Sequence, residues 1–227
     1  MTGVQTCALP ISDHTAIVVG LHQFLVAHLQ AVRDAGPDPS GAMPVDVLLA
    51  AAAETNTGES DLVANVILAA TSGHRSATQG LALAVLALAR DPLQYDRLRA
   101  DPALLPVAVE ELLRWDSPVQ FTNRLVTADV EVDGCPVPAG AVVMLALGGA
   151  NHDPAAFPGD ELDVGAARRP HLSFGRGTHY CAGAALARLA IAEALGVLVA
   201  RVPRLSIVEP PSFTAARRGL ESLQVMW

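Results

Sequence analysis

The sequence predicts a mainly α-helical fold with a small β-sheet region. Apolar segments at helical spacing alternate with proline and glycine stops over most of the chain, whereas residues 119–144 change to short alternating stretches and turns. Of the 227 residues, 51% are hydrophobic and 17% are charged. A chain of this length and composition can bury one large core or two small ones rather than stay disordered.

Helices are expected where apolar residues recur with a period near 3.6 between breaker residues. The first expected helix, residues 15–33, is followed by the glycine- and proline-rich loop 36–42. Asp-Pro steps at residues 91–92 and 101–102 interrupt the apolar pattern, because proline cannot continue a helix. The other expected helices cover residues 45–54, 61–89, 93–100 and 106–115, and a last one runs from about residue 184 to about residue 200.

The β region is expected where strand-forming residues replace the alanine and leucine pattern. An alternating strand is expected over residues 126–132, followed by a turn at residue 134. A second turn is expected over residues 136–140 and an extended strand over residues 142–144. A proline- and glycine-rich meander should cover residues 152–170, and an extended segment through Val225 should close the chain.

Charge and cysteine content exclude several classes of partner. The net charge is −8 at pH 7 and the isoelectric point is about 5.2, so we expect no nucleic acid and no membrane as partner. Residues 14–32 lack formal charge, but they carry histidines and glutamines and present one apolar face, as a packing helix does. The cysteines Cys7, Cys135 and Cys181 show no paired spacing, which indicates a reducing cytoplasm rather than a disulfide framework or a zinc ribbon.

Residues 174–183, Phe-Gly-Arg-Gly-Thr-His-Tyr-Cys-Ala-Gly, are the most informative segment. Cys181 stands just before an expected helix, whose first turn offers unpaired backbone N–H groups and the positive end of its dipole. Gly177 and Gly183 let the backbone approach a flat ligand closely. Such surroundings favour a thiolate, which is the form of cysteine that binds metal. A lone cysteine without this pattern would be a structural one.

The spacing Phe-x-x-Gly-x-x-x-Cys-x-Gly, with His179 two residues before the cysteine, resembles the haem-binding loop of the cytochrome P-450 family. The resemblance covers residues 12–227 and implies the C-terminal half of the cytochrome P-450 fold, as part of one haem-thiolate domain whose N-terminal half is missing. It implies that Cys181 ligates the iron of haem b (iron protoporphyrin IX). Phe174 is implied to pack beside the thiolate.

Glu111 and Arg114 match the family's Glu-x-x-Arg, which implies a buried structural pair that holds the meander behind the haem. By itself, this i, i+3 spacing would indicate only an exposed helix salt bridge. The family adds a second arginine from the meander. Here Ala166 stands at the matching place, with Arg168 and Arg169 nearby.

Arg124 and His179 are implied to bind the two haem propionates. Arginine suits this role because its fixed fork of donors grips carboxylates. Taken singly, each of these two residues would be an ordinary surface cation.

The long central helix departs from the family pattern of glycine, any residue, acid and threonine. In residues 72–77, Ser-Gly-His-Arg-Ser-Ala, Arg75 replaces the acid and Ser76 replaces the threonine. A serine hydroxyl can still deliver a proton on the distal side. Arg75 either points away from the pocket or grips a substrate carboxylate, as in the peroxide-using branch of the family.

The predicted function is that of a haem-thiolate monooxygenase, which inserts one oxygen atom from O₂ into a small-molecule substrate. Its electrons would come from a ferredoxin-type donor with its reductase, in the cytoplasm. Three alternatives stay open: a peroxygenase that uses Arg75, an inactive fragment that does not retain haem, and a metal-free nucleophile built from Cys181 and His179.

Residues 1–11, Met-Thr-Gly-Val-Gln-Thr-Cys-Ala-Leu-Pro-Ile, look like a translated sequencing adapter. They are excluded from the fold prediction. The natural sequence is therefore expected to start near Ser12, in the middle of a gene, and the isolated chain is expected to be inactive.

Overall fold

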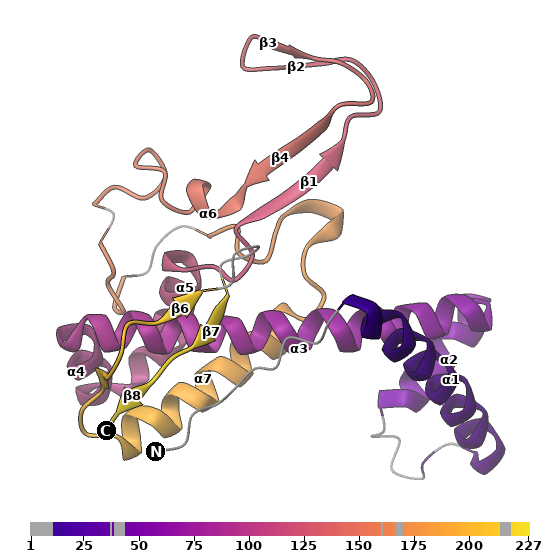
Figure 1. Cartoon of the computed structure of the whole chain (residues 1–227), viewed down its shortest axis with the longest axis horizontal. Coiled ribbons are helices and arrows are strands. Elements are labelled where there is room, and N and C mark those ends of the chain that lie inside the picture. Colours follow the sequence, from indigo (N-terminus) through magenta and orange to yellow (C-terminus); the bar gives the residue numbers. More distant parts are fainter. Residues whose placement is uncertain (1–10, 37, 39–43, 160, 167–169, 214–218) are drawn as a thin grey trace. The chain divides into compact units, whose positions relative to one another are not determined.

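Helices dominate the part of the chain that the structure describes. The structure is a computed structural model, and it describes residues 11–36, 38, 44–159, 161–166, 170–213 and 219–227. Helices alternate there with short two-stranded sheets (Figure 1), so the expected fold class is confirmed. The chain divides into two compact units, one within Cys7–His74 and one within Arg75–Trp227. Most of the adapter-like segment lies outside the described residues.

The first unit consists of α1 (Ile11–Ala35), α2 (Pro44–Glu54) and the beginning of α3 (Glu59–Arg90). Its core is small, and Leu29, Leu62 and Val63 are its fully buried members. The one-sided apolar pattern predicted for the first helix therefore packs against its neighbours. Among the described residues, no helix combines the length and apolarity needed to cross a membrane.

The second unit is built on the C-terminal part of α3 and three further helices, α4 (Pro92–Ala100), α5 (Leu105–Trp115) and α7 (Ala184–Arg201). Asp91 starts α4, and its side chain accepts a hydrogen bond from the backbone N–H of Gln94 at 3.2 Å. A 3-10 turn, η1 (Pro102–Leu104), connects α4 to α5. The four helices share the main core, to which the meander adds Leu162 and Val164.

Gly80 of α3 lies where three helices meet. A Cβ atom there would stand 3.5 Å from Leu113 of α5 and 3.5 Å from Ile191 of α7. Ser76 lies one turn earlier on the same face of α3.

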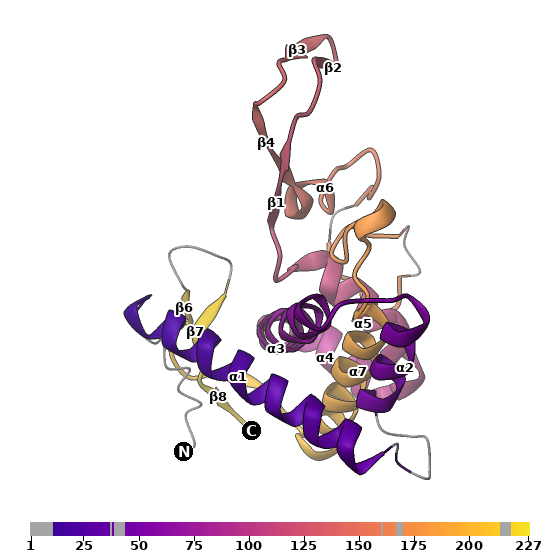
Figure 2. The ribbon, with the colours of Figure 1, turned by 90° about the vertical axis from the view of Figure 1, so that its right-hand side faces the viewer.

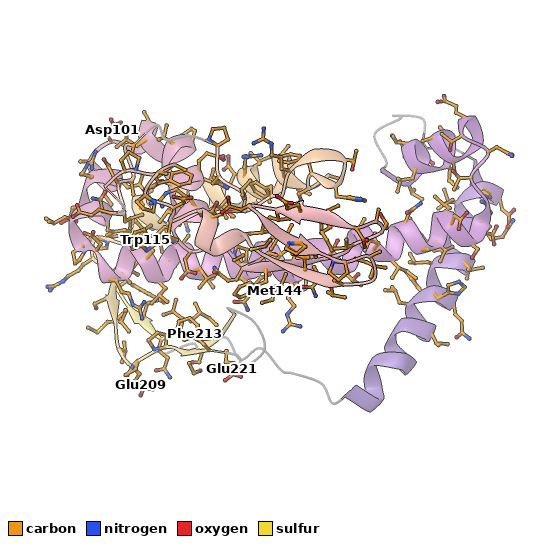
Figure 3. All side chains as sticks on the ribbon, turned by 90° about the horizontal axis from the view of Figure 1, so that it is seen from above. Asp101, Trp115, Met144, Glu209, Phe213 and Glu221 are labelled. Atoms are coloured by element: carbon orange, nitrogen blue, oxygen red, sulfur yellow. The ribbon has the colours of Figure 1, made fainter. Side chains whose placement is uncertain are left out.

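An arm of four strands leaves this core. β1 (Phe121–Leu125) pairs with β4 (Val142–Ala146), and β2 (Val130–Val132) pairs with β3 (Cys135–Val137) at the tip, as Figures 1 and 2 show. Asp133 and Gly134 both have positive φ (49° and 77°), as the tight turn of a hairpin requires. The side chains of both long strands are largely exposed, including Met144 (Figure 3).

The strand expected over residues 126–132 is only partly correct, because it begins at Val130. Strand β1 was not expected, since Phe-Thr-Asn-Arg-Leu lacks apolar alternation; its pairing with β4 creates it. The remaining elements are short: α6 (Leu147–Ala150), β5 (Ser206–Ile207), β6 (Ser212–Phe213), β7 (Leu220–Ser222) and β8 (Val225–Met226).

Candidate functional site: the cysteine loop

Residues 171–183, here called the cysteine loop, fold back on themselves through backbone hydrogen bonds. The N–H of Cys181 donates to the carbonyl oxygen of Phe174 at 3.0 Å. The N–H of Tyr180 donates to the carbonyl oxygen of Gly177 at 3.0 Å and closes the 3-10 turn η2 (Gly177–His179). Gly175 and Gly177 have φ values of 72° and 81°, which other residues rarely adopt. The loop therefore depends on its glycines.

The thiol of Cys181 is exposed and stands directly before α7. Tyr180 beside it is 48% exposed. Gly183 stands beside the sulfur, since a Cβ atom there would lie 3.9 Å from it. An accessible sulfur beside an exposed aromatic ring, on a glycine-rich backbone, fits a flat metal-containing ligand. No cluster of three or more histidine, cysteine or acidic residues that could hold a metal ion occurs in the described ranges.

Glu111 and Arg114 form a bidentate ion pair in the core behind the cysteine loop. Arg114 Nε donates to Glu111 Oε2 at 2.8 Å and Arg114 Nη2 to Glu111 Oε1 at 2.9 Å. Both side chains are only 1% exposed. The N–H of Asp163, in the meander, approaches Glu111 Oε1 at 3.3 Å. Arg168 and Arg169, the nearest candidates for a third partner, lie outside the described residues.

Asn151, which no sequence motif marks, joins this pair to the cysteine loop. Its carbonyl oxygen accepts from Arg114 Nη1 at 2.8 Å, and its Oδ1 accepts from the N–H of Leu172 at 2.7 Å. Its Nδ2 donates to Ser173 Oγ at 3.0 Å. The buried pair and the start of the loop are thus connected through one fully buried residue.

A second ionic cluster, which no sequence motif marks, also contacts the cysteine loop. Arg188 of α7 donates to Glu110 of α5 through Nε at 2.5 Å and through Nη2 at 3.0 Å. His171 Nε2 lies 3.3 Å from Glu110 Oε2. Burial raises the pKa of the Glu110 carboxyl, but contacts with His171 and Arg188 outweigh it and lower the pKa from 4.5 to about 2. Bonding to Glu110 raises the pKa of Arg188.

The other predicted site residues stand on separate elements. Arg124 lies on β1, exposed, and its Nη1 donates to Thr122 Oγ1 at 3.0 Å and to the carbonyl oxygen of Asn123 at 2.8 Å. Arg75 and Ser76 lie on α3, with Arg75 exposed and Ser76 half-buried. The contacts of Asn151 thus join the cysteine loop to Glu111 and Arg114. Arg124, Arg75 and Ser76 stand on other elements of the chain.

The second unit also has a surface hollow of about 720 Å³. It is bordered by Arg90, Trp115 and His152 among others (Trp115 is labelled in Figure 3). None of the predicted site residues lines it, so the candidate site is defined by the loop and not by this hollow.

Comparison with known proteins shows which family this chain resembles. The family model described as Cytochrome P-450 matches residues 11–202. The Biotin biosynthesis cytochrome P-450 of Bacillus subtilis (strain 168) is 37% identical over 166 residues, which are 73% of this chain and 42% of that protein. Cytochrome P-450 107B1 of Saccharopolyspora erythraea is 39% identical over 194 residues, 80% of this chain and 48% of that one.

Among solved structures, P450BioI in complex with hexadec-9Z-enoic acid ligated Acyl Carrier Protein matches with a TM-score of 0.86 and 32% identity. The match covers 95% of this chain and 56% of that one. The chain thus spans about two fifths to one half of the length of the curated relatives it matches.

Proposed function

This chain belongs to the cytochrome P-450 family, and on that premise we propose that it is part of a haem-thiolate monooxygenase in which Cys181 ligates the iron of haem b. The observation that carries the proposal is the exposed thiol of Cys181 on a glycine-shaped loop at the start of α7. When bound, the haem would supply the oxidising chemistry, which inserts one oxygen atom from O₂ into a small-molecule substrate.

The residues of this chain would bind and orient that group. Gly177 and Gly183 would let the backbone lie close to the haem, and the ring of Phe174 would pack beside the thiolate. Arg124 and His179, both exposed, would each pair with one propionate. The buried pair of Glu111 and Arg114 would hold the cysteine loop and the meander in place behind the haem.

Ser76 would work on the distal side as a hydroxyl that passes a proton toward the substrate pocket. Its place one turn before Gly80, where α3 comes close to α5 and α7, supports this role. Arg75, next to it, would not carry the proton itself because a guanidinium stays charged at all ordinary pH values.

A peroxide-using haem-thiolate enzyme is the second candidate function, and Arg75 is the observation that favours it. The arginine stands where the family has an acid, and its exposed guanidinium could bind a substrate carboxylate. Hydrogen peroxide should then support oxidation of a fatty acid by the full-length protein, and Arg75→Leu should abolish that reaction. If peroxide supports no turnover of any fatty acid, this candidate is lost.

The proposal extends to the location, the partners and the domain limits of the protein. We place the protein in the cytoplasm, with a ferredoxin-type electron donor and its reductase as partners, and with neither nucleic acid nor membrane. Residues 12–227 would be the C-terminal part of one haem-thiolate domain, and residues 1–11 an adapter-derived artefact. The isolated chain would be inactive, because it spans only 42% and 48% of the two curated relatives described above.

The test is the absorption spectrum of the reduced protein with carbon monoxide, recorded on the full-length gene product and on the 227-residue chain supplied with haem. The full-length protein should show the thiolate type of band, and Cys181→Ser should lose it. Cys135→Ser is the matched control, since Cys135 is also a free, exposed cysteine. A Cys181→Ser protein that keeps the thiolate band and its activity would overturn the assignment.

A further inference from the structure

The ionic cluster of Arg188, Glu110 and His171 has no part in the roles assigned above. We propose that this cluster holds the cysteine loop in its haem-binding shape before haem arrives, and that Arg188 is the positioning residue for Cys181. The inference rests on the proposed haem-thiolate function, and it concerns three residues that no sequence motif used above contains.

Arg188 contacts the loop on both sides of its closing hydrogen bond. Its guanidinium carbon lies 4.4 Å from the centre of the Phe174 ring, and its Nη1 donates to the hydroxyl of Tyr180 at 3.2 Å. The carbonyl of Phe174 in turn accepts the N–H of Cys181. Arg188 thus holds both Phe174, which bonds to Cys181, and Tyr180, which precedes Cys181 in the chain.

Glu110 fixes the direction of that guanidinium. Two parallel N–H···O bonds to one carboxylate allow a single orientation of the planar group, which a lysine could not reproduce. Glu110 comes from α5, whereas Arg188 comes from α7, and the packing of these two helices sets their separation.

His171 anchors the start of the loop to the same carboxylate. Its side chain is 4% exposed, and its Nδ1 accepts the backbone N–H of Ser173 at 3.1 Å. The ring proton therefore sits on Nε2, which faces Glu110 Oε2. Nε2 lies 3.3 Å from Glu110 Oε2, without the geometry of a regular hydrogen bond.

The loop needs such an external support because two of its residues are glycines at positive φ. Glycine loses more conformational freedom on ordering than any other residue, so the loop backbone by itself favours many shapes. Arg188 restricts that freedom at Phe174 and Tyr180. Its half-exposed guanidinium extends from α7 and is held by the Glu110 carboxylate of α5.

Limited trypsin digestion of the haem-free protein tests the proposal, because Arg176 is exposed in the middle of the loop. Cleavage after Arg176, followed by mass spectrometry, reports how often the loop opens. Arg188→Gln should speed this cleavage about tenfold, since the hydrogen bonds it removes involve a charged group. Arg97→Gln is the matched control, because it removes an exposed ion pair with Asp163 that does not touch the loop.

Two further variants guard against simple unfolding. If Arg188→Gln accelerates cleavage at every arginine, that variant is unfolded as a whole. The test then uses Arg188→Lys and Glu110→Gln, which keep most of the packing. Both should still raise cleavage at Arg176 several-fold above the control. Wild-type rates at Arg176 in both variants would overturn the proposal.

A second readout separates this inference from the proposed function. In the full-length, haem-loaded protein, Arg188→Lys should shift part of the reduced carbon monoxide band from the thiolate to the neutral thiol form. If the wild type has no thiolate band, the proposed function fails. The positioning role alone fails under a different result. In that case the wild type has the thiolate band, Arg188→Lys has the same band, and the trypsin cleavage rates at Arg176 in Arg188→Lys and Glu110→Gln equal the wild-type rate.

Discussion

Arg114 and Asn151 stand 37 residues apart in the sequence, and in the fold the guanidinium of the first donates to the carbonyl oxygen of the second at 2.8 Å. Both side chains are almost completely buried. Because the side chain of Asn151 also accepts the N–H of Leu172, the contact connects α5 through Asn151 to the start of the cysteine loop.

Replacing Arg114 with methionine should be strongly destabilising. The change leaves the Glu111 carboxylate buried without its charged partner, which costs about 3–5 kcal/mol of unfolding free energy. Denaturant unfolding measures it. Arg97→Met, at an exposed ion pair, should cost less than about 1 kcal/mol. Equal losses in the two variants would contradict the role of burial.

Asn151→Ala should loosen the start of the cysteine loop. The variant keeps the backbone carbonyl that binds Arg114 but leaves the N–H of Leu172 without its acceptor, at a cost of about 1–3 kcal/mol. Hydrogen exchange at Leu172 should accelerate. Asn123→Ala, on the exposed strand β1, should change the unfolding free energy by less than about 0.5 kcal/mol. Unchanged exchange at Leu172 would show that Asn151 does not hold it.

Glu110 should make the stability of the protein depend on pH in the acid range. The pKa of its carboxyl is lower in the folded state, about 2 against 4.5, so the carboxylate stabilises the fold above pH 4.5. This contribution should disappear as the pH falls from 4.5 to about 2. Denaturant unfolding of wild type and Glu110→Gln should therefore differ at neutral pH and converge at acid pH. In an Arg188→Gln background the pH-dependent difference should be smaller, and an unchanged one would contradict the pairing.

Gly177→Ala should lower the free energy of unfolding by about 1–2 kcal/mol, because φ is 81° there and alanine is strained at that angle. No atom lies within 4 Å of an added Cβ, so this backbone strain is the whole of the expected cost. Gly134, in the hairpin turn, has φ of 77° and equally open surroundings, so Gly134→Ala should destabilise by a similar amount. Only Gly177→Ala should reduce haem incorporation, as measured by the reduced carbon monoxide spectrum. Equal haem incorporation in both variants would contradict the role given to Gly177.

Local pattern was sufficient for most of the helices and for the cysteine loop. The helix ends of α2, α3, α4 and α5 were predicted to within two residues, since proline, aspartate and glycine mark them in the sequence itself. The i, i+3 spacing of Glu111 and Arg114 predicted that both residues stand on one face of a helix, as they do in α5. Their burial was implied only by the resemblance to the family, because the spacing alone indicates an exposed salt bridge.

Features that depend on distant partners could not be predicted in this way. Strand β1 has no apolar alternation and exists through its pairing with β4. Glu110 and Arg188 are 78 residues apart, so no local period relates them. Two signals were nevertheless present: Glu110 adjoins the predicted acid, and Arg188 follows Cys181 by seven residues, near the start of α7.

Gly80 lets the helix that carries Ser76 pack directly against the helix that follows Cys181. A Cβ atom at this position would already stand in van der Waals contact with Leu113 and Ile191, at 3.5 Å from each. A longer side chain would therefore compete with those two residues for space. The spacing of three helices thus depends on a position that takes no part in the chemistry.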